Sequence, residues 1–161
     1  MYHKLIPDMR VKNIYEINFD SLKKMGIQYL IIDIDNTLVP QKVRYVDNKI
    51  LEWFKNINEN GFKVCLISNN TKKRVNGFKE KIGVPGIAWA IKPRKSPFKK
   101  ALKILNAKPS ETAVIGDQIF TDIFGGHRAG LYTILVVPIS KEEFGLTKIV
   151  RKFEKHILKR M

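Results

Sequence analysis

Apolar positions along the chain follow two patterns, which alternate. Short, nearly continuous apolar runs fall at residues 27–33, 62–67, 87–91, 112–116 and 131–137. Between these runs, apolar residues recur at helical spacing over residues 47–60, 71–82, 95–106 and 119–129. Continuous apolar runs are typical of strands that a parallel sheet buries on both faces. The order of elements therefore predicts an α/β fold with a doubly wound parallel sheet.

The end of the chain has a pattern of its own. Over residues 147–161, apolar residues fall near one helical face and Lys and Arg are interspersed among them. We predict a basic amphipathic helix at about 146–161, which either packs on the domain or lies on a membrane. No repeat or linker divides the chain, so we expect a single domain over residues 1–161 with its core at about 25–140.

Composition narrows the function classes. With 161 residues and 44% hydrophobic content, the chain can bury one sizeable core. A formal net charge of +15 predicts attraction to a polyanion or to an anionic membrane surface. The single cysteine excludes an internal disulfide and a cysteine-built metal site. Because no apolar run approaches a signal core or a membrane span, we expect a cytoplasmic protein, with peripheral association at the inner membrane face as an open alternative.

Two carboxylates interrupt the first predicted strand. Asp33 and Asp35 end the run that begins at Ile27, and ligands of open α/β sheets bind beyond the carboxyl ends of the strands. The pair could serve catalysis. It could also simply end the strand and cap a turn with Asn36 and Thr37, which these residue types do readily.

A second strand end carries further acids. The run at 112–116 leads through Gly116 into Asp117, and Asp122 follows five residues later. Asp122 could alternatively be an ordinary acid of a first helical turn. Carboxylates at two strand ends form an oxygen-only site of the kind that Mg²⁺ prefers, with phosphate oxygens completing its coordination.

Two more strand ends offer groups that suit a phosphate. Residues 68–71 supply the Ser68 hydroxyl, the amides of Asn69 and Asn70 and a helix amino terminus, although helix capping alone would also explain such residues. Lys92 follows the run at 87–91 and could neutralise phosphoryl oxygens. In a chain this basic, a lysine could equally be solvated surface.

In this order, the residues resemble the haloacid dehalogenase-like phosphohydrolase superfamily, subclass IIIA, whose fold is a three-layer, Rossmann-like sheet. The resemblance implies that Asp33 attacks phosphorus to form an aspartyl-phosphate and that Asp35 acts as the general acid and base. It also implies a Mg²⁺ ion held by the Asp33 carboxylate, the Asp35 backbone carbonyl and Asp117. The remaining residues that it implies hold the phosphoryl group or support the site: Ser68, Asn69 and Lys92 for the first task, Thr37 and Asp122 for the second.

The spacing of these motifs leaves no room for a substantial cap domain. Residues 36–67 and 69–91 separate the first three motifs, and one helix and one strand fill each interval. We expect an open site, which suits a phosphate on a large or membrane-embedded substrate. Whether Lys92 or Lys95 contacts the phosphate is left open.

More closely, the chain is similar to the YqeG-type branch, related to phosphatidylglycerophosphate phosphatases of mitochondria and plastids. This similarity rests on motifs that include residues 35–39, 116–118 and 133–138. It implies a Mg²⁺-dependent phosphomonoester hydrolase that acts on a phosphorylated substrate, with an anionic phospholipid as one candidate. The alternatives are a phosphatase for nucleic-acid ends or phosphoproteins, which no RNA-binding motif supports, and a non-enzymatic phosphoacceptor module. No nucleotide-binding Gly-x-x-x-x-Gly-Lys-Ser/Thr loop is present.

Overall fold

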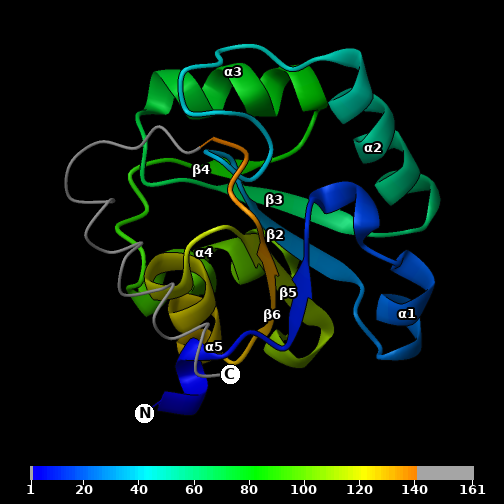
Figure 1. The fold of residues 1–161 in the computed structure, drawn as a ribbon, viewed down its shortest axis with the longest axis vertical. Coiled ribbons are helices and arrows are strands. Elements are labelled where there is room, and N and C mark those ends of the chain that lie inside the picture. Colours follow the sequence, from blue (N-terminus) through cyan, green and yellow to red (C-terminus); the bar gives the residue numbers. More distant parts are fainter. Residues whose placement is uncertain (1, 141–161) are drawn as a thin grey trace.

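A six-stranded parallel sheet forms the centre of the structure, a computed structural model that describes residues 2–140 (Figure 1). The predicted helix at about 146–161 lies outside the described residues. The strand order is β1-β6-β5-β2-β3-β4. The strands are β1 (Met9–Val11), β2 (Tyr29–Asp33), β3 (Lys63–Ile67), β4 (Gly86–Ile87), β5 (Thr112–Gly116) and β6 (Tyr132–Val136).

Helices cover both faces of this sheet. The α-helices are α1 (Phe19–Lys24), α2 (Asn48–Glu59), α3 (Lys72–Ile82), α4 (Lys95–Leu105) and α5 (Phe124–Ala129). Shorter elements are the 3-10 helices η1 (Tyr2–Leu5), η2 (Ile14–Glu16) and η3 (Pro109–Glu111), and the π-helical turn η4 (Ile119–Ile123). Helices α1, α2 and α3 lie on one side of the sheet in Figure 1, and α4 and α5 lie on the other. The three layers confirm the predicted fold class.

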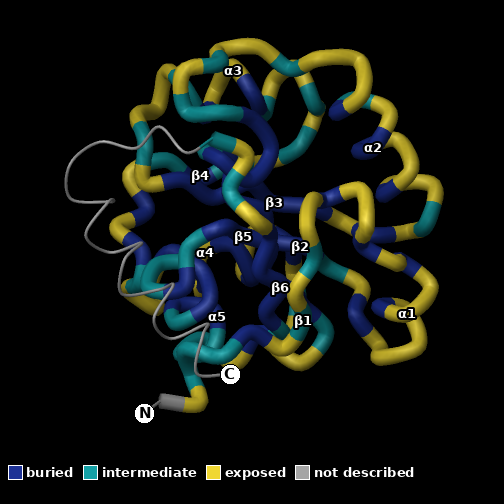
Figure 2. Tube along the Cα trace, viewed as in Figure 1, coloured by how far each residue is buried: buried dark blue, intermediate teal, exposed yellow. Residues whose placement is uncertain are grey.

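The side chains of β2 show why the sheet is buried on both faces. Leu30 and Ile32 pack in the cluster formed with α1, α2 and α3, whereas Ile31 packs in the cluster formed with α4. Successive side chains of a strand point to opposite faces, so a strand with two covered faces needs a continuous apolar run. Figure 2 shows this pattern, with the strands buried and the outward faces of the helices exposed.

The order of the strands creates a crevice at the end of β2. The chain passes from β2 to β3 and β4 on one side of it, and returns to β5 and β6 on the other. The connections at the carboxyl ends of β2 and β5 therefore diverge. Ligands of open α/β sheets bind at such a switch point.

Two predicted elements differ from the structure. The predicted strand at 87–91 is wrong beyond Ile87, because Trp89 and Ile91 have φ angles of 50° and 55°, in the left-handed region. The predicted helix at 119–129 is not one continuous α-helix. It begins as the π-helical turn η4 and becomes the α-helix α5 only from Phe124.

The sequence pattern also missed two short elements. Strand β1 has three residues and pairs with β6, and α1 has six residues, so neither is long enough to show a clear period. Within residues 2–140, one α-helix fills each of the intervals β2 to β3 and β3 to β4, as expected without a cap. Over the same residues, no helix combines the length and apolarity that crossing a bilayer requires.

Candidate active site

A tight turn after β2 separates the two acids of the first motif. Asp33 is the last residue of β2 and is 5% exposed. The turn is closed by hydrogen bonds from Leu38 N to Ile34 O, 3.0 Å, and from Asn36 N to Val39 O, 2.7 Å. Asn36 has a φ of 60°, a left-handed conformation that Asn tolerates better than most residues. Asp33 and Asp35 consequently have different partners.

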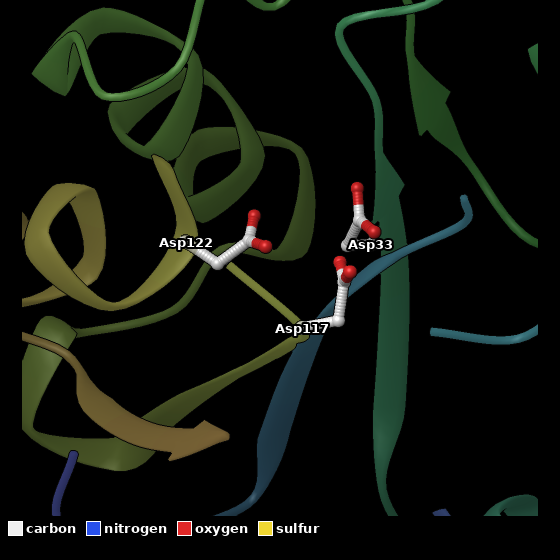
Figure 3. Close-up of side chains that lie close together, drawn as sticks. All are labelled: Asp33, Asp117 and Asp122. Atoms are coloured by element: carbon white, nitrogen blue, oxygen red, sulfur yellow. The ribbon is translucent and has the colours of Figure 1, made fainter. Parts of the chain in front are cut away.

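Three buried carboxylates meet beyond the ends of β2 and β5. Asp33, Asp117 and Asp122 each place one oxygen within 4.8 Å of the other two (Figure 3). The backbone makes this approach possible at Gly116, because a Cβ there would lie inside the Asp122 carboxyl group. Burial of three acids without water or cations is unfavourable. The cluster therefore needs positive charge.

Lys92 supplies positive charge to the cluster. Its Nζ lies 2.6 Å from Asp33 Oδ1 and 2.6 Å from Asp122 Oδ1, and the residue is 7% exposed. The Lys92 backbone N–H donates to Asn69 Oδ1 at 2.8 Å, which fixes the start of this segment. Lys95, at the start of α4, is exposed. Of the two lysines considered from the sequence, Lys92 is the one among the carboxylates.

The titration of this cluster reflects its burial and its charges. Burial raises the pKa of Asp33 well above its usual value, and the Asp122 and Asp117 carboxylates act in the same direction against the effect of Lys92. Burial alone would lower the pKa of Lys92, but Asp122 and Asp33 outweigh it and raise that pKa above its ordinary value. One ammonium group facing three carboxylates leaves an excess of negative charge, which favours binding of a further cation or proton.

Hydroxyl and backbone donors hold the carboxylates in place. Thr37 Oγ1 lies 2.9 Å from Asp33 Oδ2 and 3.3 Å from Asp117 Oδ1. The Gln118 backbone N–H donates to Asp122 Oδ2 at 3.1 Å. Charge-assisted hydrogen bonds of this kind fix the orientation of a carboxylate. Thr37, predicted from the sequence as a supporting residue, thus bridges the two strand ends.

Asp35 points to a separate set of donors. Its Oδ1 accepts a hydrogen bond from Arg74 Nε at 2.6 Å. Its Oδ2 accepts from Ser68 Oγ at 3.2 Å and from Asn70 Nδ2 at 3.4 Å. The Asp35 carboxylate is therefore not part of the three-carboxylate cluster in this structure.

Arg74 is a residue of this site that the sequence did not reveal. It lies in the first turn of α3, and its side chain is 9% exposed. Besides Asp35, it contacts the loop after β2 through Nη1, which donates to Val43 O at 2.7 Å. Its position six residues after Ser68 was the available signal. Among thirty Lys and Arg residues, one arginine at that place carries little information.

A cavity of about 310 Å³ opens above these groups. Most of the residues predicted from the sequence line it: Asp33, Asp35, Ser68, Asn69, Lys92 and Asp122. Thr37 and Asp117 are buried beside Asp33 and do not line it. Asn70, whose amide the sequence also offers to a phosphate, lines the cavity as well. The remaining lining residues carry no assigned role in the sequence motifs: Gln41, Trp89, Gln118 and Thr121.

The carboxylate cluster fits a divalent metal. Its three carboxylates offer oxygen donors, which are the ligands of hard cations, and they carry more negative charge than Lys92 balances. Asp122, predicted as a supporting residue, is itself a member of this group, with an oxygen within 4.8 Å of those of Asp33 and Asp117. The site can therefore hold a metal ion at the three carboxylates, beside the cavity that Asp33 and Asp122 line.

Comparisons with known proteins identify the family of the chain. The model of a haloacid dehalogenase-like hydrolase family matches residues 41–130. The chain is 40% identical over 153 residues to the Bacillus subtilis protein named "Probable phosphatase YqeG", covering 95% of this chain and 89% of that protein. It is 26% identical over 168 residues to the Arabidopsis thaliana chloroplastic/mitochondrial phosphatidylglycerophosphate phosphatase 1, covering 97% of this chain and 48% of that relative. This chain thus spans about half the length of the plant protein.

A solved structure supports the fold alone. The deoxy-D-mannose-octulosonate 8-phosphate phosphatase of Haemophilus influenzae superposes with a TM-score of 0.59 at 14% sequence identity. The match covers 85% of this chain and 90% of that chain. This likeness indicates that the two chains share a fold.

Proposed function

We propose that Asp33 is the nucleophile of this chain, which belongs to the haloacid dehalogenase-like hydrolases and is a phosphatase of that family. The observation that carries the proposal is the position of this carboxylate. Asp33 is buried at the end of β2, lines the cavity and has the Lys92 ammonium 2.6 Å from one oxygen. A carboxylate placed in this way can attack phosphorus while a fixed cation faces the phosphoryl oxygens.

The chemistry would proceed in two transfers. In the first, an Asp33 oxygen bonds to phosphorus, the bond to the leaving oxygen breaks, and Asp35 gives that oxygen a proton. In the second, water attacks phosphorus, Asp35 takes its proton, and the aspartyl-phosphate bond breaks to release inorganic phosphate and Asp33. Ser68 and Asn69, which line the same cavity, would hold the phosphoryl oxygens together with Lys92.

We assign the metal of this reaction as Mg²⁺. The Asp33 and Asp117 carboxylates and the backbone carbonyl of Asp35 would hold it, with Asp122 in support. When bound, Mg²⁺ neutralises charge on the phosphate and lets an anionic nucleophile approach. The buried, oxygen-only donor set and its excess negative charge support this choice over a metal that prefers sulfur or imidazole.

For the substrate, we propose a phosphate monoester on an anionic lipid, such as phosphatidylglycerophosphate. The plant relative whose name states this activity supports the proposal, although the chain spans only about half of it. The net charge of +15 supports it as well, because an anionic leaflet attracts Lys and Arg by about 1 kcal/mol for each residue close to its surface. The absence of a cap within residues 2–140 leaves the cavity accessible to a large substrate.

The chemistry is tested with a soluble aryl phosphate. We expect phosphate release by the wild type with Mg²⁺, little release with EDTA, and a loss of at least about a thousandfold in Asp33→Asn. Asp20→Asn is the matched control, because Asp20 is an exposed acid of α1 and its substitution leaves the cavity unchanged. Undiminished turnover by Asp33→Asn would refute the proposed nucleophile.

The substrate class is tested separately. The wild type and Asp33→Asn are assayed with Mg²⁺ against phosphatidylglycerophosphate in detergent micelles, sugar phosphates, nucleotides, a 5′-phosphorylated oligonucleotide and a phosphopeptide. We expect the highest kcat/KM for the lipid. A higher kcat/KM for any soluble substrate would refute the lipid assignment and leave the chemistry standing.

A further inference from the structure

Exposed apolar side chains gather on the face of the molecule that carries the cavity. Among residues 2–140, five of the eight exposed large apolar side chains lie on loops that follow strands: Tyr45, Trp89, Ile91, Val137 and Ile139. These loops follow β2, β4 and β6. Because the strands are parallel, the loops share the carboxyl edge of the sheet with the catalytic cluster. Apolar side chains exposed on one edge make that edge a candidate interaction surface.

The segment after β4 displays two of these side chains in a fixed manner. Trp89 and Ile91 are 56% and 57% exposed, whereas Ala90 and Lys92, which alternate with them, are buried. Backbone hydrogen bonds from Trp89 N to Asn70 O and from Ala90 N to Ser68 O, both 3.0 Å, attach the segment to the loop after β3. The exposure of the two side chains thus follows from the backbone.

The backbone conformation of this segment is unfavourable. A φ of 55° at a β-branched residue such as Ile91 is a true outlier, and left-handed non-glycine residues are strained. An outlier of this size at a functional site points to a role for the conformation. Here the conformation turns Ile91 and Trp89 outward at the rim of the cavity, which Trp89 also lines.

The charges of the same edge indicate the partner. Lys72 and Lys73, in the first turn of α3, and Arg94 and Lys95, at the start of α4, are exposed beside this segment. On the connections that follow the strands at this edge within residues 2–140, the exposed acids are Glu16, whose carboxylate accepts a hydrogen bond from Lys12 N, and Asp47, whose carboxylate caps α2. Basic side chains around protruding Trp and Ile residues match the headgroup region of an anionic bilayer, where amphipathic aromatic rings settle.

We propose that the carboxyl edge of the sheet docks on an anionic membrane surface, with Trp89 and Ile91 inserted among the lipid headgroups. The cavity then opens toward the bilayer, and a lipid phosphate reaches Asp33 from the membrane. This inference rests on the proposed function for the identity of the site, and adds to it the surface through which the substrate arrives.

Vesicle binding tests the surface without any need for turnover. Sedimentation is measured with vesicles of phosphatidylcholine alone and of phosphatidylcholine with 30% phosphatidylglycerol, at physiological salt. We expect the wild type to bind the anionic vesicles, and the double variant Trp89→Asn/Ile91→Asn to bind them at least about tenfold more weakly, because two apolar side chains lose their insertion. Asn is chosen because it accepts the left-handed conformation of both positions.

Two control variants replace exposed apolar side chains by amides at the opposite edge. Met25 and Ile104 are each 45% exposed and lie near the amino ends of the strands, after α1 and at the end of α4. Met25→Gln and Ile104→Gln remove a comparable exposed apolar side chain. We expect both to bind vesicles as the wild type does. A loss of binding in these controls equal to that of the double variant would overturn the proposed orientation.

Tryptophan fluorescence adds a reading on the wild-type protein. The chain has two tryptophans, and Trp53 is only 5% exposed. We expect anionic vesicles to shift the emission to the blue, and lipids brominated on the acyl chains to quench it, through Trp89. This measurement still tests the proposal if the double variant fails to fold.

Some outcomes overturn the docking surface and leave the proposed function intact. They are hydrolysis of an aryl phosphate without vesicle binding, equal vesicle binding by the double variant and the wild type, and binding of single-stranded RNA but not of vesicles. The converse result, vesicle binding that depends on Trp89 and Ile91 without any phosphatase activity, overturns the proposed function alone.

Discussion

The Arg74 guanidinium holds the Asp35 carboxylate, with Nε 2.6 Å from Oδ1. The same guanidinium donates through Nη1 to Val43 O, so that it connects α3 to the loop after β2. An arginine that is bound at both ends has little freedom to move. Together with Ser68 and Asn70, a residue outside the predicted motifs therefore orients the proposed acid and base of the reaction.

Arg74→Met tests this dependence through the leaving group. An alkyl phosphate needs a proton on its leaving oxygen, whereas p-nitrophenyl phosphate leaves well without one. We expect the rate of the first transfer, in which the leaving oxygen departs, to fall about tenfold to a hundredfold on glycerol phosphate and less than about threefold on p-nitrophenyl phosphate. Rapid-quench measurement of the alcohol or nitrophenol released in the first turnover measures the difference, because the second transfer, which also uses Asp35, is common to both substrates.

Asp35→Asn is the reference for the same experiment. It should show the same dependence on the leaving group. The combined variant Arg74→Met/Asp35→Asn should be no slower than Asp35→Asn alone, because the effects of residues that act through one another are not additive. Equal losses on both substrates in Arg74→Met would instead indicate a general structural role for Arg74.

Gly116 and Gly77 form a matched pair for stability. A Cβ at Gly116 would enter the Asp122 carboxyl group, whereas a Cβ at Gly77, in the exposed part of α3, would meet nothing within 4 Å. We expect Gly116→Ala to lower the free energy of unfolding by about 2 kcal/mol or more, and Gly77→Ala to raise it by about 0.5–1 kcal/mol. Urea denaturation curves give both values. Equal midpoints would contradict the tight packing at the end of β5.

Metal binding should appear in stability as well as in activity. Asp117→Asn removes one of the clustered carboxylates, so we expect it to melt at a higher temperature than the wild type in EDTA. Mg²⁺ should raise the melting temperature of the wild type, since a ligand at a hundred times its Kd adds about 2.7 kcal/mol. It should raise that of Asp117→Asn much less.

Asp20→Asn serves as the control for the melting experiment. Its exposed carboxylate lies on α1, so it should respond to Mg²⁺ as the wild type does. An equal Mg²⁺ response in Asp117→Asn would show that the three-carboxylate cluster does not hold the ion.

Cys65 provides a test of burial in the sheet. Burial raises the pKa of its thiol to about 12, so the thiolate is scarce at pH 8. Only the thiolate reacts with a disulfide reagent. We expect no labelling of the native protein by dithionitrobenzoate over the minutes in which an exposed cysteine, introduced by Ser96→Cys, reacts fully. Labelling of native Cys65 at the same rate would contradict its position in β3.

The features that sequence reasoning found have a common physical basis. Burying an acid at the end of a long apolar run costs free energy unless the acid has polar or charged partners. Asp33 and Asp117 therefore stand out at the ends of β2 and β5. Lys92 was weak evidence by itself, and gained weight only from its place after an apolar run. The structure brings it within 2.6 Å of Asp33.

What the sequence did not reveal depends on contacts between distant segments. Arg74 is one basic residue among thirty, and only the fold shows that it meets Asp35. Trp89 and Ile91 lie in an apolar run that resembles a strand, whereas both have left-handed φ angles, and hydrogen bonds from Trp89 N and Ala90 N attach the segment to the loop after β3. The local pattern of apolar and polar residues does not predict such long-range hydrogen bonds.

The central claim is that the Asp33 carboxylate becomes phosphorylated during turnover, and trapping that intermediate tests it most directly. The slow variant Asp35→Asn is mixed with substrate and Mg²⁺, quenched and treated with borohydride, which reduces an aspartyl-phosphate to homoserine. Peptide mass spectrometry then locates the product. We expect homoserine at position 33 and none in Asp33→Asn. Phosphate release without homoserine at position 33, or with homoserine at another aspartate, would contradict it.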